Sequence, residues 1–237
     1  MPRLSRRGEP PTARAVAADE AFRVLRTNVL VALSDLANPV VVITSAQAGE
    51  GKTTACTGLA ASLASIGQRI VAVDFDLRQP SLHRGFGAHN EFGVTNFLLD
   101  RKPLAECLQY VSLSDGDEEG QGLYLLATGP SVNNPTELLT AERTKRLLDA
   151  LSAQADVVLI DSPPVLPIAD TLEIGRMAAG AILVVEARHT EVGTAQRAKD
   201  ALIQNRTRLL GVIMNKVPAE EVGYGYGSSV PQLGSGG

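Results

Sequence analysis

The sequence predicts an α/β fold, in which helices cover both faces of a doubly wound and mostly parallel sheet. Short runs rich in Val, Ile and Leu alternate along the chain with stretches of helical periodicity, a pattern that favours parallel strands linked by helices. The apolar runs contain few polar residues, which is typical of strands buried on both faces. A length of 237 residues suits one domain of this class.

Each element follows from its local pattern. Apolar residues at spacings of three and four predict an amphipathic helix over 19–36, and Pro39 ends it. Gly67 closes the next helix, and Asn134–Pro135 begins a later one. The remaining helices are predicted over 52–66, 134–154, 168–178 and 190–206. Strands are predicted over 39–45, 69–76, 122–129, 156–161, 181–186 and 209–215. Residues 85–121, which include the acidic stretch 115–119, show no such pattern and are predicted to be irregular.

The chain divides into three parts by composition. Residues 1–18 are rich in Pro, Ala and Arg and are predicted to form a flexible N-terminal arm. Residues 19–216 carry the regular elements and form the folded domain. Residues 217–237 are rich in Gly and lack apolar periodicity, so we expect a flexible tail.

The overall composition excludes several classes of protein. A net charge of −4 argues against a strongly cationic nucleic-acid binder. The two cysteines, Cys56 and Cys107, cannot build a disulfide framework and are expected to be buried, reduced thiols. Because no apolar run reaches about 18 residues, we expect no membrane-spanning helix. We also expect no signal peptide, since no apolar stretch follows the first arginines.

A glycine-rich loop follows the first predicted strand. Residues 46–54 read Ala-Gln-Ala-Gly-Glu-Gly-Lys-Thr-Thr, a Walker A loop with alanine in place of the first glycine. Glycines in such a loop let backbone N–H groups point at phosphate, and the following helix aims its positive end at the same anion. The lysine reaches the β- and γ-phosphates, and the adjacent threonine hydroxyl is placed for Mg²⁺. The loop therefore predicts binding of ATP or ADP with Mg²⁺ by Ala48, Gly49, Glu50, Gly51, Lys52, Thr53 and Thr54.

Acidic residues end two further predicted strands. Asp74 and Asp76 follow one of them, and Asp161 follows the other. In doubly wound sheets ligands bind beyond the carboxyl ends of the strands. We therefore expect these three carboxylates to lie close to the glycine-rich loop, with a cation or a proton reducing their repulsion.

The joint pattern resembles a known family. The Walker A loop, the hhhDxDxR element over 71–78 and the hhhhDxxP element over 157–164 are similar to those of the bacterial tyrosine kinases of capsular and exopolysaccharide biosynthesis. The resemblance covers about residues 19–226, with further matching stretches at 78–87, 93–100, 129–139 and 211–217. It implies an ATP-dependent protein-tyrosine autokinase, with a P-loop fold of the Min/Par type, that regulates polysaccharide polymerisation and export.

The resemblance also implies roles for the site residues. Its catalytic set is Lys52, Asp74, Asp76 and Asp161. Lys52 would bind phosphate, while Thr53 and Asp161 would hold Mg²⁺ directly or through water. Asp74 and Asp76 would help to place the metal, and one of them would accept the proton of the acceptor phenol, with Asp74 favoured narrowly.

Some positions depart from the family pattern or allow a simpler explanation. Gln47 stands where the related Min/Par partition ATPases carry a second lysine, which argues against that group. Asn215 matches an adenine-contacting residue of related ATPases, although a strand-terminal turn would also explain it. His83 is interpreted as a turn residue rather than a catalyst. Family members often carry arginine at the position of Glu186, from which nothing is inferred.

The two ends of the chain carry the residues expected for assembly and autophosphorylation. Glu20, Arg23 and Arg26 fit an ExxRxxR pattern; physics alone favours a solvated ion pair, whereas the resemblance implies head-to-tail contacts in a closed ring. Tyr224 and Tyr226 are the expected phosphoacceptors. Tyr110 and Tyr124 are not, and Tyr124 is expected to be buried.

The resemblance implies partners, and the residues leave two alternative functions open. The expected partners are further copies of the chain, a membrane polysaccharide co-polymerase or activator and a phosphotyrosine phosphatase, but no nucleic acid. The expected location is cytoplasmic, at the inner face of the plasma membrane, through a partner or a fused segment missing from this sequence. The alternatives are a Par/Min-like ATPase switch and a weakly active, nucleotide-gated scaffold of polysaccharide assembly.

Overall fold

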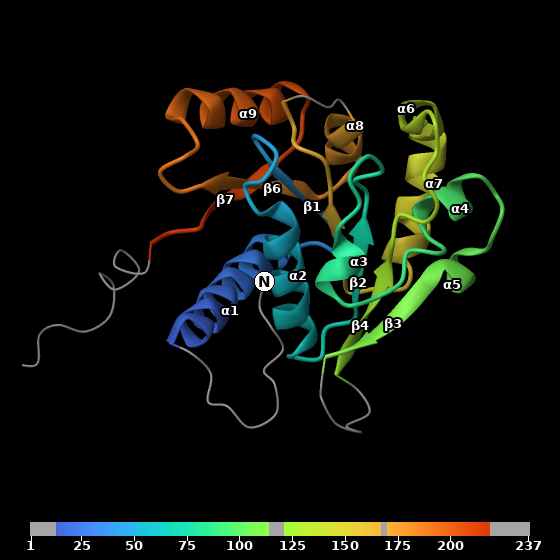
Figure 1. Cartoon of the computed structure of the whole chain (residues 1–237), viewed down its shortest axis with the longest axis horizontal. Helices are drawn as coiled ribbons and strands as arrows, with labels where there is room; N and C mark the ends of the chain where they lie inside the picture. Colours follow the sequence, from blue (N-terminus) through green and yellow to red (C-terminus); the bar gives the residue numbers. More distant parts are fainter. Residues whose placement is uncertain (1–12, 114–120, 167–169, 219–237) are drawn as a thin grey trace, which may run out of the picture.

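The fold is seen in a computed structural model that describes residues 13–113, 121–166 and 170–218. These residues form a seven-stranded sheet in the order β3-β4-β2-β5-β1-β6-β7. Within the described ranges, β3 runs antiparallel to β4 and all other neighbouring strands are parallel. Helices lie against the sheet from both sides (Figure 1). The predicted fold class is therefore confirmed.

All six predicted strands are present, and β3 is an addition. In the central strands β1, β2, β5 and β6 the apolar residues alternate between two cores, one on each face of the sheet, so both faces of these strands are buried. The strands are β1 (Val40–Ser45), β2 (Ile70–Asp74), β3 (Leu108–Ser112), β4 (Gly122–Leu126), β5 (Val157–Asp161), β6 (Gly180–Glu186) and β7 (Leu209–Asn215).

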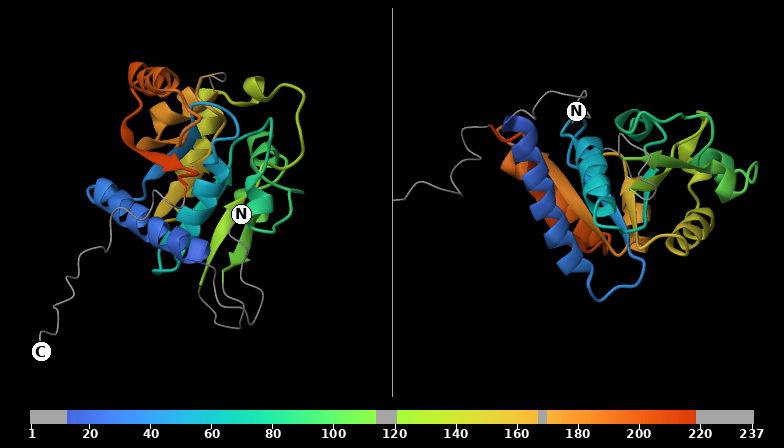
Figure 2. Two further views of the ribbon diagram at one scale, coloured as in Figure 1. Left: turned by 60° about the vertical axis from the view of Figure 1, so that its left-hand side comes forward. Right: turned by 90° about the horizontal axis from the view of Figure 1, so that it is seen from below.

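The helices cover the faces unequally. One core includes residues of α1 (Ala13–Leu33), α2 (Lys52–Ala64) and α3 (Leu82–Gly85). The opposite core includes residues of α4 (Val94–Leu98), α5 (Leu104–Cys107), α6 (Pro135–Leu138), α7 (Ala141–Ser152), α8 (Asp170–Met177) and α9 (Val192–Gln204). Helix α1 packs against α2, and the right-hand view of Figure 2 shows the two helices side by side.

The first helix begins earlier than predicted. It starts at Ala13 rather than at residue 19, and ends at Leu33 rather than at 36. Residues 13–18 include four alanines, and alanine favours helix without any apolar stripe. The boundary of the predicted arm at residue 18 is therefore wrong, whereas residues 1–12 lie outside the described part of the chain.

Two further predictions needed correction. The helix predicted over 134–154 is two helices, because the Thr140 side chain accepts a hydrogen bond from the backbone N–H of Arg143 and so caps a new start at α7. Residues 85–121 are not irregular throughout, since they contain α4, α5 and β3. These elements have four or five residues each, too few to show a period. The acidic stretch 115–119 lies outside the described residues.

Tyr124 is not buried, contrary to expectation. The residue lies on β4 and is 48% exposed. The ring packs edge-on against that of Tyr110, the residue opposite it on β3, with centroids 5.6 Å apart. Both phenols therefore remain accessible to solvent.

The cysteine prediction is confirmed, because Cys56 and Cys107 are both free and buried. In the parts of the chain that the structure describes, no helix combines the length and apolar character needed to cross a membrane.

Candidate active site

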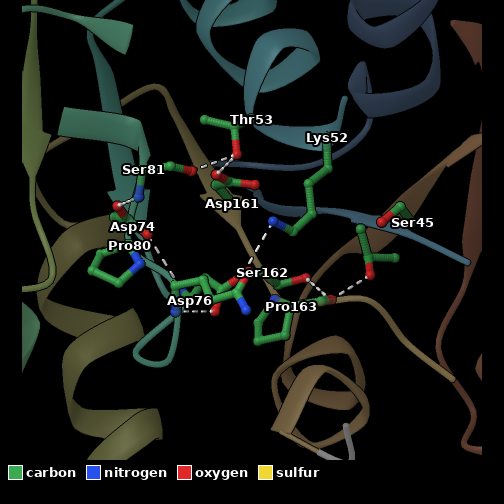
Figure 3. A network of polar contacts seen from close by, with 12 residues as sticks. Ser45, Lys52, Thr53, Asp74, Asp76, Pro80, Ser81, Asp161, Ser162 and Pro163 are labelled. Carbon is green, nitrogen blue, oxygen red and sulfur yellow. Dashed lines mark hydrogen bonds and ion pairs between the residues drawn. The ribbon is translucent and has the colours of Figure 1, made fainter. Parts of the chain in front are cut away.

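The glycine-rich loop and the acidic strand ends meet at one edge of the sheet, as predicted. The loop joins β1 to α2, and β5 lies between β1 and β2 in the sheet. Asp74 and Asp161 are register partners at the ends of β2 and β5. Lys52, Thr53 and the three aspartates project into the same small space beyond these strand ends (Figure 3).

The loop conformation depends on its glycines. Gly49 has φ of +86° and Gly51 has φ of +94°, values that side-chain-bearing residues rarely adopt. Gly51 also packs so closely against the Asn215 amide that a Cβ atom would overlap it. Gly51 precedes the first residue of α2, so the chain turns directly from the loop into the helix.

Lys52 pairs with one of the acidic residues. Its Nζ lies 3.2 Å from Asp76 Oδ2, and the two side chains are 15% and 5% exposed. The other oxygen, Oδ1, accepts a hydrogen bond from the backbone N–H of Gln79 at 3.0 Å. The lysine that the sequence assigns to phosphate therefore neutralises a buried carboxylate in this structure.

Asp74 is held against the start of α3. Its Oδ2 accepts hydrogen bonds of 2.9 Å from the backbone N–H groups of Ser81 and Leu82. Burial raises the pKa of this carboxyl, and the backbone hydrogen bonds oppose that shift. His83 Nδ1 lies 3.8 Å from the same oxygen. One oxygen, Oδ1, makes only a 3.4 Å contact with the backbone N–H of Asp76.

Asp161 and Thr53 form the part of the site suited to a hard cation. Thr53 Oγ1 donates to Asp161 Oδ2 at 2.6 Å, and it shares a 2.9 Å hydrogen bond with Ser81 Oγ. Asp161 Oδ1 is buried and has no hydrogen-bond partner in the structure. Burial raises the pKa of this carboxyl to about 7, although Lys52 and the Thr53 hydroxyl favour its charged form.

Thr53 Oγ1 and Asp161 Oδ1 are suitable ligands for Mg²⁺, which is commonly bound through one or two carboxylates together with substrate phosphates and water. A hydroxyl and an unpartnered carboxylate oxygen are both hard oxygen ligands. Both oxygens of Asp76 and Oδ2 of Asp74 already have close partners, as described above. Among the described residues, no group of three or more His, Cys, Asp or Glu side chains is arranged to hold a metal without the substrate.

Comparison with known proteins identifies the family. The family described as AAA domain matches residues 38–195. Tyrosine-protein kinase YwqD of Bacillus subtilis is 36% identical over 208 residues, which cover 87% of this chain and 85% of that protein. The kinase domain of Escherichia coli tyrosine kinase ETK superposes with a TM-score of 0.77 at 26% identity, covering 95% of this chain and 89% of that one. The BceF tyrosine kinase domain is 35% identical, with a TM-score of 0.74, over 84% of this chain and 78% of that one.

The chain belongs to the bacterial tyrosine kinases.

Family membership makes this protein a tyrosine-protein kinase with a nucleotide-binding loop. Its fold is also that of the cell division ATPase MinD from Pyrococcus furiosus, which has a TM-score of 0.64 but is only 20% identical. Some relatives are much longer. The putative tyrosine-protein kinase EpsB of Ralstonia solanacearum is 33% identical over 94% of this chain, but the match spans only 29% of that protein.

The structure places Asn215 on the kinase's phosphate loop. Its Nδ2 donates to the backbone oxygen of Glu50 at 2.8 Å. Motif reasoning assigned Glu50 to the loop but missed its partner Thr190, and it missed Ser81, which contacts Thr53. No sequence spacing indicates these contacts, because the partners come from separate elements.

The three charged residues of α1 do not act together. Glu20 and Arg23 pair at 3.4 Å on the surface, where both side chains are about two-thirds exposed. Arg26 instead donates to the backbone oxygen of Ser62 on α2 at 2.9 Å. Phe22 packs directly over Gly58, where a Cβ atom would overlap the ring. Helix α1 is therefore docked on the helix that begins with Lys52.

The burial of Asp161 predicts how the stability of the nucleotide-free kinase depends on pH. Its pKa is about 7 in the folded chain, against an ordinary value of 3.8 for an aspartate side chain. Between these values the folded protein binds one proton more than the unfolded chain, so the free energy of unfolding falls as pH rises, by at most about 1.4 kcal/mol per pH unit. Urea unfolding at pH 5.5, 6.5 and 7.5 should show this slope, and Asp161→Asn should remove it. The same slope in both proteins would contradict the assignment.

Proposed function

We propose that this kinase transfers the γ-phosphate of ATP, bound with Mg²⁺, to Tyr224 and Tyr226 of its own tail. Transfer would occur between neighbouring subunits of a ring, and it would regulate the polymerisation and export of capsular polysaccharide or exopolysaccharide. The observation that carries the proposal is the convergence of Lys52, Thr53 and the three aspartates at one sheet edge (Figure 3). Tyr224 and Tyr226 lie outside the described residues.

The loop residues bind and orient the nucleotide. Backbone N–H groups of 48–54 and the positive end of α2 face the phosphates. Lys52 exchanges Asp76 for the β- and γ-phosphates, and so brings positive charge to the oxygens where negative charge builds up during transfer. Thr53 and Asp161 would hold Mg²⁺, which supplies further neutralisation of the phosphate charge. We assign Asn215 a place on the adenine side of the same site.

The remaining aspartates position the acceptor. In a loose phosphoryl-transfer transition state, orientation of the phenol matters more than a strong base. Asp74 keeps Oδ1 without a short hydrogen bond, so this oxygen is our choice to accept the phenol proton. Asp76 loses its cation when Lys52 moves to phosphate, and it then helps to orient the metal and the acceptor.

A mass measurement separates this proposal from its alternatives. The purified chain is incubated with Mg-ATP, and intact mass and released ADP are measured together. Gains of whole phosphate units support the kinase proposal. Release of ADP without a gain in mass would instead establish an ATPase switch of the Par/Min type. If neither a gain in mass nor released ADP is found, the nucleotide-gated scaffold is the remaining alternative.

We further propose the partners that such a role requires. The family resemblance implies joint work with a membrane polysaccharide co-polymerase, either fused or separate, and the long relative EpsB, of which the match spans less than a third, has room for such a fused segment. The kinase would then act in the cytoplasm, at the inner face of the plasma membrane. A phosphotyrosine phosphatase would reset the tail.

Assembly should depend on the exposed part of α1. Glu20→Ala with Arg23→Ala removes two charges that are about two-thirds exposed and is expected to lower the mass seen by light scattering and the rate of phosphorylation between subunits. Arg26→Ala should mainly lower stability, by about 1 kcal/mol, because it removes the hydrogen bond to Ser62. The control is Lys145→Ala with Asp149→Ala, a similarly exposed ion pair on α7. An oligomer unchanged by the α1 pair would exclude the ring contact.

A further inference from the structure

The phosphate loop contains a buried carboxylate with both oxygens paired. Glu50 is 3% exposed. Its Oε2 accepts a hydrogen bond of 2.8 Å from the backbone N–H of Gln47, at the start of the loop. Its Oε1 accepts a hydrogen bond from the Thr190 hydroxyl, in the connection between β6 and α9. The Glu50 carboxylate thus connects the start of the phosphate loop, at Gln47, to the β6–α9 connection, at Thr190.

The Thr190 hydroxyl is fixed in its donor role. Its oxygen accepts a hydrogen bond of 2.8 Å from the backbone N–H of Glu186, at the end of β6. The hydroxyl hydrogen is therefore free to point at Glu50. On the opposite side, the Asn215 amide at the end of β7 donates to the Glu50 backbone oxygen at 2.8 Å. The loop after β1, the connection after β6 and the last residue of β7 thus meet at Glu50.

The position of Glu50 explains why the loop needs such contacts. It lies between Gly49 and Gly51, both with positive φ. Glycine has more conformational freedom than any other residue, so a loop with two of them loses much entropy when it takes one shape. A loop held in its binding shape before the ligand arrives avoids that loss during binding.

We propose that Glu50, Thr190 and Asn215 form a clamp that holds the phosphate loop in the curvature that accepts nucleotide. Thr190 is then a positioning residue for the kinase, because it acts through Glu50 and does not touch phosphate. The clamp also joins the ends of β6 and β7, on the proposed adenine side, to the phosphate side of the site. Its effect on phosphorylation rests on the proposed function, whereas its effect on nucleotide binding does not.

The test compares isosteric variants. Thr190→Val keeps the shape but loses both the donor to Glu50 and the acceptor of the Glu186 N–H, and Thr190→Ser keeps both. The control is Thr207→Val, the same exchange at a buried threonine whose hydroxyl has no hydrogen-bond partner in the structure, whereas Thr190 is half-buried. ADP affinity is measured by calorimetry, KM and kcat by phosphate transfer, and folding by thermal unfolding.

We expect Thr190→Val to weaken ADP binding by about tenfold to a hundredfold, the range typical of a lost hydrogen bond to a charged group. KM for ATP should rise more than kcat falls. Thr190→Ser should bind ADP nearly as the parent protein does, and Thr207→Val should be unchanged.

Two results would overturn the clamp. One is parental ADP affinity in folded Thr190→Val, and the other is an equal loss of affinity in Thr207→Val. If Thr190→Val does not fold, Glu50→Gln tests the same contact, since its amide would turn an N–H group toward one of two donors. Parental affinity in folded Glu50→Gln would then refute the proposal. A third outcome separates the two proposals. If Thr190→Val binds ADP more weakly but neither the parent protein nor any variant transfers phosphate, the clamp is supported and the tyrosine autokinase proposal is refuted.

Discussion

Replacement of Lys52 by methionine should abolish tyrosine phosphorylation. Lys52 begins α2 and is only 15% exposed, so its charge acts where little water screens it. The loss of such a contact to the transferring phosphoryl group typically lowers the rate by about 10²–10³ or more. Intact mass after incubation with Mg-ATP measures the loss. If folded Lys52→Met were phosphorylated to the same extent as the parent protein, the assignment of the loop to the active site would be refuted.

A double variant controls for stability. Lys52→Met leaves Asp76, which is 5% exposed, without its cation, and an unpaired buried charge is destabilising. We expect Lys52→Met to unfold at lower urea concentration than the parent protein. Adding Asp76→Asn should restore much of the stability but none of the phosphorylation. Recovery of both would mean that the lysine serves only to neutralise Asp76.

Replacement of Tyr224 and Tyr226 together by phenylalanine should remove nearly all phosphate from the protein. Strand β7 is parallel to β6 and ends at Asn215, so the chain leaves at the edge of the sheet that carries the site. Eleven residues separate Asn215 from Tyr226, and a glycine-rich coil of that length spans roughly 18 Å on average and at most about 37 Å. The phenols are thus within reach of a nearby site. Peptide mapping by mass spectrometry after reaction with ATP measures the label.

The matched control for the tail is Tyr110→Phe with Tyr124→Phe. These rings are 55% and 48% exposed, so burial alone would not keep them from being phosphorylated. They lie on paired strands, and each backbone is fixed by the ladder between them. We expect the control to retain full phosphorylation. Phosphate confined to Tyr110 or Tyr124 would refute the tail as the acceptor.

The sequence predicts the parts of the fold that repeat a pattern over enough residues. The run Val40–Ile43 predicts a strand buried on both faces because no polar residue interrupts it. Elements such as α4 and β3 are too short for a period, and β3 is stabilised by pairing with a strand that follows it in sequence. The start of α1 was missed because alanine favours helix without marking a buried face.

The site was predictable where a motif carries its own geometry. Glycine spacing around Lys52 and acidic strand ends indicate residues that a parallel sheet must bring to one edge. Contacts between distant segments carry no such signal, since Thr190 lies 140 residues from Glu50. For Arg26 the sequence pattern gives a signal, but that signal points to a different contact from the one in the structure. Its pattern suggests a surface contact, but its guanidinium binds α2 within the same chain.

The docking of α1 on α2 has a thermodynamic consequence. Phe22 over Gly58 and Arg26 at Ser62 make the proposed ring-forming helix and the nucleotide-binding helix parts of one packed unit. If contact between subunits shifts α2, it changes the affinity for ATP by some factor. Reciprocity then requires nucleotide to change the association constant of the subunits by the same factor. Cellular ATP and the local concentration of the kinase would act on one shared equilibrium.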